Sequence, residues 1–71
     1  MPFIKVNIIK NVLSAEEKPQ IIEEITDVFA RMKGEGFAEG TWVAINELDE
    51  GNWGEGGSVV KLENISDSAR D

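Results

Sequence analysis

The chain has 71 residues, no cysteine and no histidine, and 7 Lys and Arg against 14 Asp and Glu give it a net charge of -7. This charge repels phosphate backbones and anionic membrane surfaces, so we expect neither nucleic acid nor a membrane as a partner. A chain of this size without disulfides or an ordinary zinc site is expected to gain stability by association of several copies. The lack of cysteine, of an apolar leader and of a bilayer-spanning run favours a cytoplasmic location.

The first predicted element is a strand over Phe3–Ile9, directly after Pro2. Its residues alternate between two faces, and one face carries only β-branched side chains: Ile4, Val6 and Ile8. A proline is tolerated at the start of a strand, because the end of a sheet often lacks that hydrogen bond anyway. The alternative interpretation is chemical, since removal of Met1 would leave Pro2 with a free secondary amine.

The next predicted element is a helix from Ser14 to Lys33. Ser14 and Glu17 have the spacing of a capping box, in which each side chain accepts a hydrogen bond from the other residue's backbone. Lys33 followed by Gly34 is typical of a helix C-terminus. Pro19, just past the first turn, predicts a local distortion or a later start. Apolar residues at helical spacing form one stripe: Ile21, Ile25, Val28, Phe29 and Met32.

A second strand is predicted over Thr41–Leu48. The helix between the two strands is about as long as each strand, so it returns the chain to the edge where it started and the strands run parallel in a right-handed βαβ unit. One helix covers only one face of this sheet, which leaves apolar residues on the far face uncovered by their own chain: Phe3, Ile9, Trp42, Ala44 and Leu48. We therefore expect other subunits to cover that face, and any site there to lie between chains.

The glycine-rich stretch DEGNWGEGG follows the second strand. It contains acidic residues and neither Lys nor Arg, so it is a poor phosphate loop, and a hairpin or bulged turn that presents Trp53 is favoured. Ser58–Leu62 is expected to be a short strand. The predicted fold class is therefore α/β (α+β): a single βαβ domain over residues 1–62 with parallel strands and a C-terminal hairpin or short strand, followed by a polar tail over residues 63–71.

The chemistry narrows by elimination. Without histidine or cysteine the common nucleophilic triads are excluded, and the usual nucleotide-binding motifs are absent from the sequence. Paired carboxylates on the helix surface are expected to be solvated. The amine of a free Pro2 remains as a candidate general base, because apolar surroundings disfavour its charged form. We expect that pocket to involve four apolar side chains: Phe3, Ile9, Trp42 and Trp53.

The segments MPFIKVNII, TWVAINEL and GNWGEGG, with the capped helix between the first two, resemble the 4-oxalocrotonate tautomerase family over residues 1–62. The resemblance implies a homohexamer built as a trimer of dimers, and an isomerase that needs no cofactor. It also implies that the amino-terminal proline, here Pro2, takes a proton from a small enol or α-keto acid and returns it at another carbon. Trp53 matches an aromatic position against the substrate, and Ile9 matches an apolar position on the pocket wall.

Two residues depart from the members that act on dicarboxylates. Val12 and Trp42 stand where such members resemble one another in placing arginine, and apolar side chains cannot hold a carboxylate as a guanidinium does. We therefore expect a substrate more apolar than a dicarboxylate, bound in part by Val12 and Trp42. One anchor could be replaced by a point charge from Lys5, Lys10 or Lys61, although an ordinary surface lysine is favoured at each position. Addition or decarboxylation with the same amine stays open, and a catalytically inert oligomeric binding module is the alternative if Met1 is retained.

Overall fold

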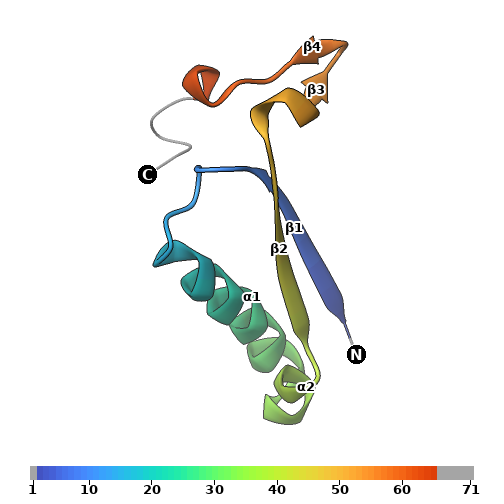
Figure 1. Ribbon diagram of the computed structural model, residues 1–71. Helices are drawn as coiled ribbons and strands as arrows, with labels where there is room; N and C mark the ends of the chain where they lie inside the picture. Colours follow the sequence, from blue (N-terminus) through green and yellow to red (C-terminus); the bar gives the residue numbers. More distant parts are fainter. Residues whose placement is uncertain (1, 66–71) are drawn as a thin grey trace.

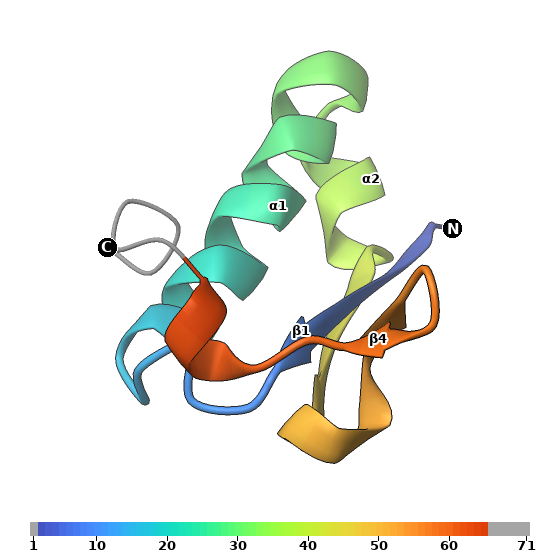
Figure 2. The same cartoon turned by 90° about the horizontal axis from the view of Figure 1, so that it is seen from above.

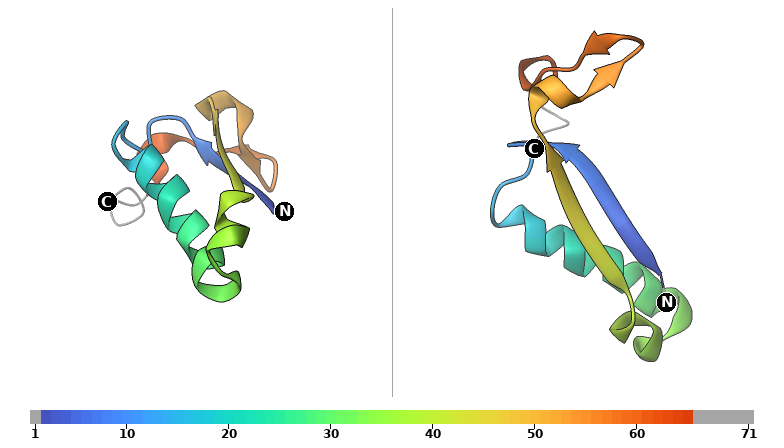
Figure 3. Two further views of the ribbon diagram at one scale, coloured as in Figure 1. Left: turned by 90° about the horizontal axis from the view of Figure 1, so that it is seen from below. Right: turned by 45° about the vertical axis from the view of Figure 1, so that its right-hand side comes forward.

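The structure of the protein, a computed structural model, describes residues 2–65. Strands β1 (Phe3–Ile9) and β2 (Trp42–Leu48) form a parallel two-stranded sheet, and helix α1 (Glu17–Lys33) lies along one face of it (Figure 1). The predicted βαβ unit with parallel strands is therefore confirmed. In Figure 3 the other face of the sheet carries neither a helix nor a strand along most of its length, within the described part of the chain.

The register of the sheet pairs Phe3 with Trp42 at one end and Ile9 with Leu48 at the other. Exposure alternates along β1 as the sequence pattern predicts, with half-buried side chains on the face toward α1: Ile4, Val6 and Ile8. On the opposite face Asn46 Nδ2 donates a hydrogen bond to Asn7 Oδ1 at 3.1 Å. Strand β1 has the predicted bounds, and β2 begins one residue later than predicted.

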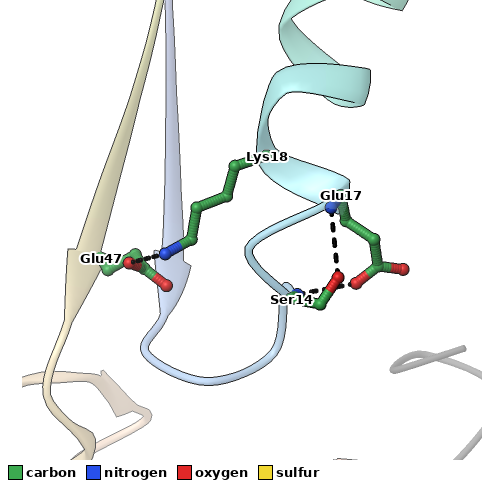
Figure 4. Close-up of polar contacts among 4 residues, drawn as sticks. All are labelled: Ser14, Glu17, Lys18 and Glu47. Carbon is green, nitrogen blue, oxygen red and sulfur yellow. Dashed lines mark hydrogen bonds and ion pairs between the residues drawn. The ribbon is translucent and has the colours of Figure 1, made fainter.

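Helix α1 begins as the capping box predicts. The Ser14 N–H donates to Glu17 Oε1 at 2.8 Å, and the Glu17 N–H donates to Ser14 Oγ at 3.1 Å (Figure 4). Regular helix starts at Glu17, so Pro19 is the third helical residue, where an N–H would have no partner within the helix. The predicted later start is confirmed. The helix ends at Lys33, and Gly34 has a φ of 100° while its N–H donates to the Ala30 carbonyl.

A second short helix, α2 (Glu35–Glu39), was not predicted from the sequence. It is held against α1 by a stacked pair of rings, Phe29 and Phe37, whose centroids lie 5.9 Å apart. The Thr41 hydroxyl then donates to the Phe37 carbonyl oxygen at 2.9 Å, just before β2 begins. Five residues between two glycines are too few to show helical periodicity, which is why the pattern gave no sign of α2.

The segment after β2 forms the predicted hairpin. A 3-10 turn over Glu50–Asn52 precedes strand β3 (Gly54–Glu55), which pairs antiparallel with β4 (Ser58–Val59). The turn between them is Gly56–Gly57, whose φ values of 60° and 88° suit a tight hairpin turn. Strand β4 is shorter than the predicted Ser58–Leu62, and a second 3-10 turn, Leu62–Asn64, follows it. Of the predicted polar tail, residues 66–71 lie outside the described residues.

The core corrects one expectation. Ile9 is only 4% exposed, although we expected it to lack cover from its own chain. The C-terminal segment passes over this end of the sheet (Figure 2), and its residues line a pocket together with Ile9. Phe3 and Trp42 do remain exposed, as predicted. The radius of gyration is 14.6 Å, above the roughly 11 Å of a compact chain of this length. Between residues 2 and 65, neither helix has the length and apolar character needed to cross a bilayer.

Candidate active site

Pro2 stands at the end of the sheet where β1 begins (Figure 1). Its carbonyl oxygen accepts a hydrogen bond from the Trp42 N–H at 2.9 Å, so the first residue of β2 fixes the backbone of Pro2. The residue is half-buried. Pro2 is thus joined to the sheet through its carbonyl oxygen.

An aromatic pair lies next to Pro2. The rings of Phe3 and Trp42 meet edge to face, with centroids 6.2 Å apart and an interplanar angle of 83°. These side chains are 62% and 70% exposed, which is unusual for two large apolar groups in contact. They form an apolar surface beside the candidate base, on the face of the sheet opposite α1.

A pocket of about 290 Å³ lies at the other end of the sheet. Ile8, Ile9 and Val12 line one side of it, where β1 ends and the chain turns toward α1. The C-terminal segment supplies the other side through four residues: Trp53, Glu55, Val60 and Ile65. The Val60 N–H donates to the Trp53 carbonyl at 2.8 Å, which ties the two arms of the hairpin together. Every lining side chain except Glu55 is apolar.

The structure divides the predicted site residues between these two ends. It brings Ile9, Val12 and Trp53 together in the pocket, and it places Pro2 and Trp42 at the opposite end of the sheet. Seven residues of strand span roughly 20 Å, so one chain does not bring its own Pro2 to its own Trp53. The predicted cations, Lys5, Lys10 and Lys61, are absent from the pocket lining among the described residues.

Sequence reasoning missed four lining residues: Ile8, Glu55, Val60 and Ile65. A signal for Glu55 was present, because it follows Trp53 by two positions and alternate residues of an extended segment point to the same side. No comparable signal marked Val60 or Ile65. Their places depend on the path of the chain after the hairpin, and that path has no periodic pattern.

An ion pair braces the pocket end of the sheet. Lys18 Nζ lies 2.7 Å from Glu47 Oε1 and so links the first turn of α1 to β2 (Figure 4). The hydrogen bond from Lys18, together with its charge and the Asn11 N–H, lowers the pKa of the Glu47 carboxyl below its usual 4.5. Within residues 2–65, no three acidic side chains gather closely enough to hold a metal ion.

Comparison with known proteins shows to which family the chain belongs. The sequence profile described as "Tautomerase enzyme" matches residues 2–63. The chain belongs to the tautomerase family. A curated relative, "Probable tautomerase K2" from Dickeya dadantii (strain 3937), is 38% identical over 60 residues, which cover 84% of this chain and 88% of the relative. The membership supports an isomerase activity of the tautomerase type.

Solved structures agree with this assignment. DmpI from Helicobacter pylori superposes with a TM-score of 0.72 at 30% identity, over 83% of this chain and 95% of that one. TomN, a 4-oxalocrotonate tautomerase homologue in the tomaymycin biosynthetic pathway, superposes with a TM-score of 0.74 at 25% identity, over 83% and 88% of the two chains. The resemblance to the 4-oxalocrotonate tautomerase family noted in the sequence is therefore confirmed.

Proposed function

We propose that the protein is a cofactor-independent tautomerase in which the secondary amine of Pro2, freed by removal of Met1, is the general base. The observation that carries this proposal is the place of Pro2. It directly precedes β1, its carbonyl oxygen accepts a hydrogen bond from the Trp42 N–H, and the family match begins at this residue. The charged form of an amine is disfavoured in apolar surroundings, so Phe3 and Trp42 favour a neutral, proton-accepting Pro2.

The reaction then needs only one group that accepts and returns a proton. The neutral Pro2 nitrogen takes the proton from the hydroxyl of an enol acid, and the electron pair of that O–H bond forms the carbonyl. The electron pair of the carbon-carbon double bond then forms a new C–H bond at the carbon that does not carry the hydroxyl, with the proton returned by the Pro2 ammonium. Such a positioned base contributes about 10² to 10⁴ in rate.

We infer that the complete site contains residues from more than one chain. Pro2 and the pocket lie at opposite ends of the sheet, and the exposed aromatic pair beside Pro2 matches the apolar lining of the pocket in character. A second copy that presents its Pro2 end to the pocket would bring Pro2 to Ile9, Val12 and Trp53 of its neighbour. A homo-oligomer, such as the hexamer that the family resemblance implies, provides this arrangement and covers the exposed face of the sheet.

The proposed substrate is an enol or α-keto acid that is more apolar than a dicarboxylate. Val12 lies in the pocket and Trp42 beside Pro2, and both bring apolar surface where an arginine would bind a second carboxylate. Within the described residues the pocket lining contains neither Lys nor Arg. An aryl or alkyl side chain on the enol acid fits such a pocket better than a second carboxylate does.

The alternative function, a catalytically inert binding module, depends on Met1. If Met1 is retained, the Pro2 nitrogen belongs to a tertiary amide and has no basic lone pair. The intact mass of the purified protein separates the two functions. A mass lower by one methionine is expected, and a full-length mass would favour the binding module.

The catalytic test compares the two prolines of the chain. Ketonisation of phenylenolpyruvate, followed by its ultraviolet absorbance, is expected to slow by about 10² or more when Pro2 is replaced in Pro2→Ala. Pro19→Ala is the matched control, because Pro19 lies exposed in the first turn of α1. Unchanged turnover in Pro2→Ala, with Met1 shown to be absent, would contradict the proposal.

A further inference from the structure

We propose that Glu55 determines the charge selectivity of the site: it excludes substrates whose distal end is anionic and favours those whose distal end is neutral or cationic. The inference rests on the proposed function and deepens it, because it names the substrate class by charge. Glu55 is the one charged side chain among the described residues that line the pocket. Because Glu55 lines the pocket and is also exposed to solvent, it lies at the mouth of the pocket.

The hairpin fixes Glu55 on the side of the pocket. Trp53 has extended backbone angles, and Gly54–Glu55 is strand β3, so Trp53 and Glu55 alternate to the same side. Glu55 pairs with Ser58 across the tight Gly56–Gly57 turn, so its backbone is held on both sides. The Glu55 carboxylate and the Trp53 indole therefore line the same side of the pocket.

No cation neutralises this carboxylate within the described chain. The ion pair recorded between residues 2 and 65 joins Lys18 to Glu47 and does not involve Glu55. Glu50, an acidic residue of the same segment, instead fixes the chain after the hairpin, because its Oε1 accepts a hydrogen bond from the Leu62 N–H at 2.9 Å. Glu55 is thus left as the acid available to a ligand in the pocket.

The electrostatic consequence depends on the distal group of the substrate. A carboxylate there would lie near a like charge beside apolar walls, where the repulsion is attenuated less than in bulk water. An ammonium group would form a charge-assisted hydrogen bond with Glu55. A neutral aryl group would gain from the apolar lining and be indifferent to the charge. The expected order of preference is cationic, then neutral, then anionic.

The test uses three enol acids that differ only in the para substituent of one ring: phenylenolpyruvate, its para-carboxylate and its para-aminomethyl derivative. In Glu55→Gln we expect kcat/KM for the para-carboxylate to rise about tenfold relative to the unsubstituted compound. For the para-aminomethyl compound we expect a fall of similar size. The unsubstituted compound is the internal reference, so the two ratios report the charge of the distal group and not a general change in activity.

Glu24→Gln is the matched control, since it removes the same charge from an exposed position on α1, far from the pocket. It should leave all three ratios unchanged, which separates a local effect from the net charge of -7. Equal ratios in wild type and Glu55→Gln would overturn the inference. If Pro2→Ala still abolished turnover in that case, the proposed function would stand and only the role of Glu55 would be wrong.

Discussion

The two ends of the β1·β2 sheet differ in how far one chain completes them. At the pocket end, Ile9 is only 4% exposed and lines the pocket together with residues of the C-terminal segment, and the Lys18–Glu47 pair joins α1 to β2. At the Pro2 end, Phe3 and Trp42 remain 62% and 70% exposed and contact each other. The pocket end thus has apolar walls that one chain supplies, whereas the Pro2 end, where we propose the base, has an exposed aromatic surface.

This difference supports the proposal that the 71-residue chain is a subunit whose site is completed by another copy. A chain this short buries few side chains, and among the described residues the buried apolar side chain, Ile9, lies at the pocket end. The Pro2 end is left as a surface whose apolar character suits contact with another copy. Three predictions sharpen the comparison, beginning with the largest expected effect.

The pocket end should carry most of the stability that a single chain supplies. Ile9→Ala removes the most buried apolar side chain and should lower the free energy of unfolding by about 2 to 4 kcal/mol. Val59→Ala, at a position 52% exposed, should change it by less than about 0.5 kcal/mol. Urea denaturation at one fixed protein concentration measures both, since association also contributes to stability. Equal effects would mean that Ile9 is not the centre of the core.

The Pro2 end should matter for association more than for folding. Trp42→Ala is expected to weaken the association of subunits by about 2 kcal/mol, because large aromatic side chains dominate interfaces. Sedimentation velocity over a range of concentrations would show this as dissociation at higher concentration than in wild type. Arg31→Ala, which truncates an exposed side chain of α1, is the control and should not shift it. A Trp42→Ala oligomer as stable as wild type would place the interface elsewhere.

The ion pair at the pocket end should give a small, pH-dependent effect. The pKa of Glu47 is lowered in the folded state, so its contribution to stability is present above the unfolded value near 4.5 and is lost as the pH falls through the folded pKa. Lys18→Gln should therefore be less stable than wild type at neutral pH, and the difference should vanish in acid. Urea midpoints of both proteins between pH 7 and 3 test this. A difference that persists at pH 3 would assign it to lost packing of the Lys18 stem.

Local patterns predicted the elements well, and long-range contacts account for what they missed. Alternation over Phe3–Ile9 and the Ser14–Glu17 capping box need only neighbouring residues, and both are confirmed. Helix α2 is too short for a periodic signal, and its position depends on the stacking of Phe37 on Phe29. Ile9 is buried and lines a pocket with residues of the C-terminal segment, and no pattern in β1 encodes the path of that segment.

The candidate site was predictable to the same extent. Pro2 and Trp53 were singled out from their chemistry and from the family resemblance. Their separation at opposite ends of the sheet follows from the strand order and was visible only in the structure. Glu55 was treated as one of the acidic residues that make the glycine-rich stretch a poor phosphate loop. Its place in the pocket lining is the observation on which the proposed charge selectivity rests.

The central claim, that Pro2 of one chain works with the pocket of another, is tested most directly by mixing two impaired variants. Pro2→Ala lacks the base and Trp53→Ala lacks the aromatic wall, so each alone should turn over phenylenolpyruvate poorly. Unfolding the two proteins together and refolding the mixture should restore activity to about a quarter of wild type, because some sites then combine an intact Pro2 with an intact pocket. A refolded mixture that is no more active than the average of its two parents would contradict a site shared between chains.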